Sequence, residues 1–437
     1  MPYTPHTKDD VQAMLAQIDI EDEQELFDSI PQELRAKQFE LKDGLSEFEV
    51  YENFKELANK NETSKVCFLG GGYYDHIIPS AVDALSNRSE FYTAYTPYQA
   101  EASQGTLQAL YEYQTLICEL SGMEVTNASM YDGGTAMAEA ALMAIRITKR
   151  DKIIIDIGVN PIYIKIVKTY LAYHDIKTVV MSLEDKLDSL LDANTAGYIF
   201  QNPNFFGSIE DFTSIIEALH VNKSLAIMSA YPIALGVLKT PGEMGADIYC
   251  ADGQSLGNYL GFGGPSFGIL ATKQKYVRNL PGRIVGMTND RDGKRAFVLT
   301  LQAREQHIRR ARATSNICSN QNLMTLRATI FMSLLGKEGF AKLALQNYNN
   351  ANYLLSELKK IENIKIFNRS PIFNEFVIET PLSGDEFLDK MSQRGFFAGL
   401  KLESLFENFE KRILVSVTEK RTKAQMDSFV SSIKEVL

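Results

Sequence analysis

The sequence predicts an α/β protein with a mostly parallel central sheet and flanking helices. A small C-terminal α+β domain follows it, and an N-terminal helical arm precedes it. The chain has 437 residues, well above the ~250–300 at which a single hydrophobic core stops growing. Short apolar runs alternate with helical patterns from residue 66 to about 280, and the pattern changes after about residue 345. We therefore expect an arm over 1–62, a large domain over 63–330 and a small domain over 331–437.

The arm is predicted from two helical segments separated by polar residues. Segment 7–18 starts at Thr7, with Asp10 three residues later to form a capping box, and its apolar residues follow helical spacing. Segment 46–61 repeats this arrangement from Ser46. Such an arm could wrap a neighbouring chain or cap its own domain, and both interpretations stay open.

The large domain is predicted from compact apolar runs that end at Gly, Asn or Pro. These strand candidates are 152–158, 178–183, 196–203, 224–232 and 246–253. The segments 161–176 and 212–223 lie between them and have helical periodicity. Strands alternating with helices imply βαβ units and a parallel sheet that binds ligands beyond the carboxyl ends of its strands.

The small domain is predicted from a mixture of both patterns. Helices are expected over 349–361, 387–396 and 423–437, and strands over 363–367, 374–380 and 412–418. This mixture is typical of an α+β domain.

Composition narrows the classes of partner and compartment. The formal net charge of −10 argues against nucleic acid or an anionic membrane as the main partner, because both need clustered Lys and Arg. The chain shows neither a signal-peptide pattern at its start nor a run of 18 apolar residues. We expect a cytoplasmic, bacterial protein.

The four cysteines predict neither a metal site nor a disulfide framework. Cys67, Cys118, Cys250 and Cys318 lie far apart, with no CxxC pair and no histidine at metal-ligand spacing. We expect buried thiols in a reducing compartment.

Three stretches are candidates for chemistry. In residues 91–123, Tyr92, Tyr95 and Tyr98 lie three apart around Pro97, on a segment too rich in Pro and Gln for a helix start. Aromatic residues with a polar group on such a loop often line a pocket. The alternative is that they pack against the helix that follows.

In the second stretch, Gly133, Gly134 and Thr135 open a long Ala-rich helix. The free N–H groups at a helix start can bind an anion or a cofactor phosphate. Gly-Gly also occurs in ordinary turns between secondary-structure elements. The third stretch joins "DGQSLGNYLGFGGPSFGILATK" (252–273) to an Arg- and Gly-rich region over 280–321, which contains Arg283.

Together these stretches carry a resemblance. "YTPYQAEASQGTLQALYEYQTLICELSGM", "GGP", "LPGRIVG" and "QAREQHIRRARATSNICSNQ", in this order, closely resemble the glycine decarboxylase (P-protein) family of the glycine cleavage system. The similarity covers nearly the whole chain, more loosely beyond residue 330. Members consist of one long chain with two homologous halves or of two subunits, and this chain is similar to the first subunit.

The resemblance implies a fold-type-I pyridoxal-phosphate (PLP) transferase-like fold. It also implies an enzyme that decarboxylates glycine and passes the aminomethyl group to the lipoyl arm of H-protein. The family's cofactor-bearing half contains a His-Lys pair before its GGP turn. The lysine of this pair lies eleven residues before the proline of the turn. The corresponding positions here hold Gly253 and Gln254. An amide cannot form an imine with an aldehyde.

A second departure lies where this fold places a carboxylate against the pyridine nitrogen, because Tyr231 stands there. A phenol with a pKa near ~10 supplies no charge at neutral pH. The resemblance therefore implies a half-enzyme whose PLP is bound covalently by a lysine-bearing second subunit, in an α2β2 assembly. The cleft-lining candidates of this chain are Tyr95, Thr96, Tyr98, Gly133, Gly134, Thr135, Gln254, Ser255 and Arg283.

Two other functions remain as alternatives. A non-catalytic scaffold would explain the missing lysine but not the retained loops. A stand-alone PLP aminotransferase would need Lys239 or Lys273, and neither lies at the expected place: Lys239 follows its strand too early and Lys273 lies past the Gly-rich turn.

Overall fold

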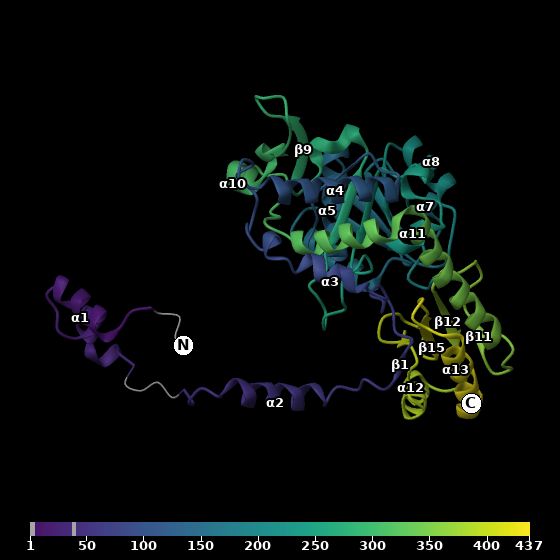
Figure 1. Cartoon of the computed structure of the whole chain (residues 1–437). Coiled ribbons are helices and arrows are strands. Elements are labelled where there is room, and N and C mark those ends of the chain that lie inside the picture. The colour runs from purple at the N-terminus through teal and green to yellow at the C-terminus, as the bar shows by residue number, and fades with distance from the viewer. Residues whose placement is uncertain (1–4, 37–40) are drawn as a thin grey trace. The chain divides into compact units, whose positions relative to one another are not determined.

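The structure is a computed structural model that describes residues 5–36 and 41–437. It divides into two compact units, Met1–Thr63 and Ser64–Leu437, which we describe separately (Figure 1). The division of the chain at residue 330 stays a prediction.

The first unit contains helices but almost no core. Its elements are α1 (Lys8–Gln17), η1 (Glu23–Phe27), η2 (Gln32–Leu34) and α2 (Glu47–Ala58). Both predicted helices are confirmed, and capping boxes form at Thr7 and Ser46. Among the described residues of this unit only Leu15 is buried. Residues 1–63 hold 16 Asp/Glu and six Lys/Arg, whereas residues 64–437 hold 39 of each, so the whole net charge lies in this unit.

The second unit is built around a seven-stranded sheet in the order β2-β8-β7-β6-β5-β3-β4. Strands β3 to β7 run parallel to one another, and β8 is antiparallel to both of its neighbours. The five predicted strands are confirmed, with ends shifted by a few residues. The strand bounds are β2 (Val125–Thr126), β3 (Lys152–Asp156), β4 (Lys177–Met181), β5 (Thr195–Gln201), β6 (Leu225–Ser229), β7 (Ile248–Asp252) and β8 (Gly268–Thr272).

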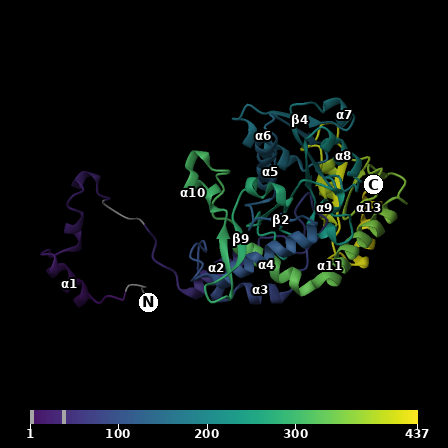
Figure 2. The same ribbon diagram turned by 90° about the horizontal axis from the view of Figure 1, so that it is seen from above.

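Helices cover both faces of this sheet. Because successive strand residues point to opposite faces, Ile154 packs into one core, whereas Ile153 and Ile155 pack into the other. The two groups of helices lie on opposite sides of the sheet (Figure 2). One face carries α4 (Gln104–Ser121), α8 (Thr213–Val221) and α11 (Asn322–Leu358), and the other carries α5 (Gly133–Thr148) and α6 (Pro161–Leu171).

The C-terminal part adds a four-stranded sheet in the order β11-β12-β15-β14 and a separate β1-β13 pair. The predicted helix over 349–361 is only the end of α11, which starts at Asn322 and is interrupted at Gly336. The bounds are β1 (Val66–Cys67), β11 (Lys365–Ile366), β12 (Glu375–Glu379), α12 (Gly384–Gln393), β13 (Phe396–Phe397), β14 (Leu400–Lys401), β15 (Arg412–Ser416) and α13 (Lys423–Val436).

The remaining elements are short. An antiparallel hairpin of β9 (Ile284–Asn289) and β10 (Arg295–Thr300) lies in the Arg-rich region, and the sequence did not predict it. The short helices are α3 (Ser80–Ser86), η3 (Ser89–Phe91), α7 (Leu187–Leu190), η4 (Pro232–Gly236), α9 (Pro241–Met244), η5 (Gln274–Asn279), η6 (Gln302–Arg304), α10 (Gln306–Arg309) and η7 (Arg310–Arg312).

Within the described ranges, none of the helices is both long enough and apolar enough to span a bilayer. Cys250 is buried, Cys67 and Cys118 are half-buried, and Cys318 is exposed. The expectation of buried thiols is therefore wrong for Cys318, which lies on a surface segment that precedes α11.

Candidate functional site

The cleft at the carboxyl ends of the parallel strands contains Asp252, the last residue of β7. Its buried carboxylate accepts hydrogen bonds from the N–H of Gly133 at 3.0 Å and of Gln254 at 2.9 Å. The hydroxyls of Tyr73, at 3.2 Å, and of Ser266 also donate to it. Burial raises the pKa of Asp252. The protein's own carboxylate therefore occupies the helix start where an external anion was expected.

The Gly-Gly-Thr turn opens α5, as predicted. Asp132 caps this helix by accepting a hydrogen bond from the N–H of Thr135 at 2.8 Å. A Cβ atom on Gly133 would lie 2.6 Å from the Tyr163 hydroxyl, far inside van der Waals contact. Gly133 is thus required by close packing against the body of the cleft.

Gln254 is buried beneath the segment that enters the cleft from β1. Its carbonyl oxygen accepts from the N–H of Tyr74 at 3.0 Å. Its amide nitrogen donates to the carbonyl oxygens of Tyr74 at 3.1 Å and Asn258 at 2.9 Å. The side chain at the lysine position is a fully hydrogen-bonded cross-link between two backbone segments.

Tyr231 follows β6 and lies at the base of the same cleft. Its hydroxyl is hydrogen-bonded to Nε2 of His76, whose Nδ1 lies 2.8 Å from the Glu419 carboxylate. Burial raises the pKa of Tyr231 well above its ordinary value, so the phenol is neutral. Ser255 is buried beside it.

Glu375, the first residue of β12, closes the cleft from the C-terminal part. Tyr74 donates its hydroxyl proton to this carboxylate at 2.6 Å, and the N–H of Gly71 donates at 2.6 Å. Burial raises the pKa of Glu375 to about 7. The entering segment 71–76 is therefore bonded at one end of the C-terminal sheet, to Glu375 at the start of β12 and to Glu419 just after β15.

These residues do not fit PLP. The cofactor needs an amine, an anionic partner for its ring nitrogen and a free anion site, whereas this cleft offers the Gln254 amide, the Tyr231 phenol and a helix start already bonded to Asp252. The cavity left between them measures about 40 Å³, enough for a few water molecules only. It is lined by Gly72, Tyr74, Asn160, Tyr163, Gln201, Ser229, Ala230, Tyr231, Pro232, Ala251 and Asp252.

The remaining predicted site residues form a second group around the 92–98 loop. Arg283 is buried and donates from Nη2 to the Tyr98 hydroxyl at 2.8 Å, with its guanidinium 5.2 Å from the Tyr98 ring centre. The Thr96 hydroxyl lies 2.6 Å from that of Ser319. Tyr95 is 88% exposed. The loop is thus fixed on both sides of Pro97 while the Tyr95 side chain projects outward.

Arg283 also organises the segment that precedes α11. Its Nη1 donates to the carbonyl oxygen of Cys318 at 3.1 Å, and its Nε lies 3.5 Å from the Glu305 carboxylate. His307 lies 3.6 Å from the same carboxylate and packs edge-on against Tyr98, with ring centres 5.7 Å apart.

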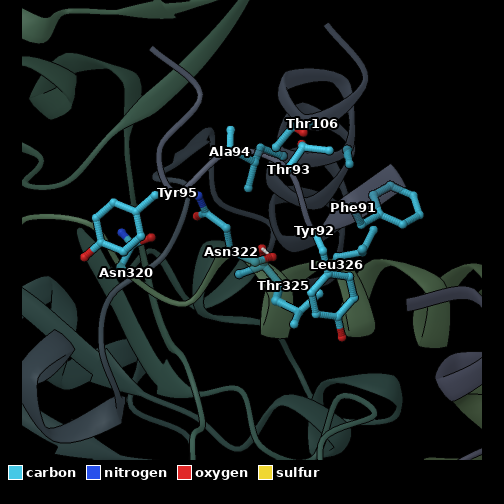
Figure 3. Close-up of a pocket in the computed structure, with 13 residues that line it drawn as sticks. Phe91, Tyr92, Thr93, Ala94, Tyr95, Thr106, Asn320, Asn322, Thr325 and Leu326 are labelled. Carbon is cyan, nitrogen blue, oxygen red and sulfur yellow. Dashed lines mark hydrogen bonds between the residues drawn. The ribbon is translucent and has the colours of Figure 1, made fainter. Parts of the chain in front are cut away.

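A pocket of about 380 Å³ opens beside this loop (Figure 3). In this view Tyr95 and Asn320 are drawn on one side of the pocket and Phe91 on the other. The lining residues are Phe91, Tyr92, Thr93, Ala94, Tyr95, Thr106, Ala109, Leu110, Asn320, Asn322, Leu323, Thr325 and Leu326. The predicted residues therefore separate into a filled inner cleft and an outer loop that borders an open pocket.

Sequence reasoning missed several polar residues of both groups. Asp252 stands at the end of a predicted strand, two residues before Gln254. Because ligands bind beyond the carboxyl ends of parallel strands, this position could have identified Asp252 as a cleft residue. Glu375, Glu419 and Asn320 carry no local signal, because their partners lie far away in the sequence.

The seven-stranded sheet and its covering helices define the class of protein. The chain is similar in structure to glutamate decarboxylase of Lactobacillus brevis, with a TM-score of 0.65 and 15% identity over 94% of this chain and 97% of that one. At this identity the likeness concerns the fold alone, and it confirms the expected fold-type-I architecture.

Closer relatives show the family. The family model for the glycine cleavage system P-protein matches residues 1–433. The chain is 51% identical to probable glycine dehydrogenase (decarboxylating) subunit 1 of Geotalea uraniireducens and 50% identical to that of Citrifermentans bemidjiense, over 100% of each chain. It also matches a crystal structure of inhibitor-bound glycine decarboxylase (P-protein) of the glycine cleavage system, with a TM-score of 0.93, 41% identity and full coverage of both chains. The chain belongs to the glycine cleavage system P-protein family.

Proposed function

We propose that this chain is subunit 1 of a glycine decarboxylase and that a second subunit carries the PLP. The proposal rests on full-length similarity to proteins named as subunit 1 and, above all, on the filled inner cleft. Gln254 offers a hydrogen-bonded amide instead of the amine that an imine requires. Asp252 accepts a hydrogen bond from the N–H at the helix start. The assembled enzyme would release CO2 from glycine and transfer the aminomethyl group to the lipoyl arm of H-protein.

The outer loop is the part of this chain best placed to act on the partner's site. In the wider fold the cofactor lies at an interface, so loops of the neighbouring chain can close over it. Tyr98 accepts a hydrogen bond from Arg283, which leaves the phenol proton of Tyr98 free to be donated outward. Tyr95 presents an exposed ring and hydroxyl. Together they can supply hydrogen bonds and an apolar wall that excludes water.

This proposal extends to the assembly and its location. We expect an α2β2 heterotetramer held by apolar interfaces of the obligate size class, ~2,000–5,000 Å² or more, in the cytoplasm. The exposed aromatic side chains of the second unit, among them Tyr259 and Phe262, suit such an interface better than open solvent.

The test uses the chain mixed with the second subunit and lipoylated H-protein, and measures exchange of glycine's carboxyl carbon with labelled bicarbonate. Tyr95→Phe and Tyr98→Phe keep the ring and remove the donor. If the donor acts in the transition state, exchange should fall by about ten- to a thousandfold. The control is Tyr173→Phe, which changes a tyrosine that is 95% exposed on the turn after α6.

The outcome separates the rival functions. Absence of exchange in every mixture, despite stable assembly, would favour a non-catalytic scaffold. Normal exchange in both loop variants would leave the loop hydroxyls without a catalytic role.

A further inference from the structure

Three arginines, Arg309, Arg310 and Arg312, form an exposed patch on α10 and η7. Between residues 302 and 320 the chain has four arginines and one acidic residue, Glu305. Glu305 is already shared by Arg283 and His307. Within residues 5–36 and 41–437, no ion pair engages the three patch arginines; the Arg309 side chain donates to the carbonyl oxygen of Ala303. The patch is therefore an uncompensated positive surface.

The patch lies beside the outer loop. His307 packs edge-on against Tyr98, and Glu305 binds Arg283, which holds Tyr98. The patch begins two residues beyond His307. Figures 1 and 2 both show α10 at the periphery of its unit, where a protein of moderate size can approach it.

The charge of this patch disfavours burial in a permanent subunit interface. Burying three like charges without counter-charges is costly, and obligate interfaces are largely apolar. A transient partner with an acidic surface gains instead, because complementary charge speeds encounter and orients the partner.

We infer that the arginine patch is the docking surface for the acidic face of the lipoyl carrier protein that delivers its arm to the active site. This inference rests on the proposed function. It names a place and a chemistry for the encounter: a carboxylate-rich surface of the carrier contacts Arg309, Arg310 and Arg312, and its lipoyl arm then starts next to the Tyr98 loop.

The experiment compares triple variants in the assembled enzyme, at low and physiological ionic strength. Replacing all three arginines by Gln removes the charge, and replacing all three by Lys keeps it. The control replaces Arg291, Lys294 and Arg295 by Gln, which removes three exposed positive charges from the β9–β10 hairpin. The readouts are the apparent KM for lipoylated H-protein, direct binding of H-protein to the assembly, and assembly with the second subunit.

The Gln triple variant should raise the apparent KM for H-protein roughly tenfold or more at low salt. It should also lose most of the salt dependence that the unmodified enzyme shows, since exposed charges are screened over about 8–10 Å. The Lys triple variant and the hairpin control should stay within about twofold of the unmodified enzyme, by the same charge argument.

Other results would overturn the inference. An unchanged KM and unchanged H-protein binding in the Gln variant would mean that the carrier docks elsewhere. Weakened assembly with the second subunit would assign the patch to that interface. If the unmodified mixture shows no exchange at any carrier concentration, the proposed function itself fails, which is a separate result.

Discussion

Replacing Gln254 by Leu should destabilise the protein although it removes no catalytic group. The substitution keeps the approximate volume but leaves three backbone groups without their partner: the N–H and C=O of Tyr74 and the C=O of Asn258. Both residues are buried, with exposed fractions of 6% and 2%. An unsatisfied buried polar group costs about 1–3 kcal/mol, and carbonyls with two lone pairs cost the least. We expect a total loss of about 3–5 kcal/mol.

Thermal unfolding measures this loss. With an unfolding entropy of about 2.1 cal/mol/K per residue, the 374-residue unit Ser64–Leu437 converts 3–5 kcal/mol into a fall in Tm of about 4–6 °C. Gln393→Leu at the exposed end of α12 is the matched control and should leave Tm nearly unchanged. A fall of less than about 1 °C for Gln254→Leu, beyond the control, would refute the cross-linking role.

Two further predictions concern the same cleft, and a third concerns assembly. After borohydride reduction with PLP, the isolated chain should carry no pyridoxyl adduct. Gln254→Lys should not create one, because Asp252 and Tyr231 still occupy the anion site and the ring-nitrogen position. A stoichiometric adduct in mass spectrometry would contradict this prediction. The chain should co-elute with the second subunit and raise its melting temperature, and dissociation on modest dilution would count against an obligate interface. Glu375 binds its proton more tightly when folded, with a pKa of about 7 against an ordinary 4.5. Its contribution to stability is therefore complete below pH 4.5 and lost as pH rises to about 7, which amounts to about 3 kcal/mol. Urea unfolding from pH 5 to 8 should show a flatter profile for Glu375→Gln, and parallel profiles would refute this assignment.

Much of the fold could be predicted because its signals are local. Each central strand is a short apolar run that ends at a turn residue, and each covering helix repeats apolar residues at helical spacing. The errors fell where these signals fail. The helix α11 is buried on several sides around Phe331, which removes the amphipathic pattern. The β9–β10 hairpin has alternating burial only in part, and charged residues fill its turn.

Site residues could be predicted only where their position along the chain identifies them. The spacing to Pro265 identifies Gln254 as the residue at the lysine position, but the three hydrogen bonds that define its role involve backbone groups of Tyr74 and Asn258. Periodicity gives no information on such a contact, since residue 74 lies 180 positions away. The same holds for His76 and Glu419, which are 343 positions apart. The residues of the outer loop could be grouped from the sequence, because Tyr95, Thr96 and Tyr98 lie in one short segment.

The filled cleft suits the role that we propose, in which this chain supports the cofactor chemistry of a partner subunit. A cleft that admits a cofactor needs room and free polar groups, whereas here segment 71–76 is bonded to Glu375, Gln254 and Glu419 at once. These bonds tie the central sheet to the C-terminal sheet across the cleft, so movement between them requires breaking several buried hydrogen bonds. The Arg283–Tyr98 contact and the pocket beside it belong to the same compact unit, Ser64–Leu437. A precise wall for a neighbouring active site depends on such rigidity more than on any reactive group of its own.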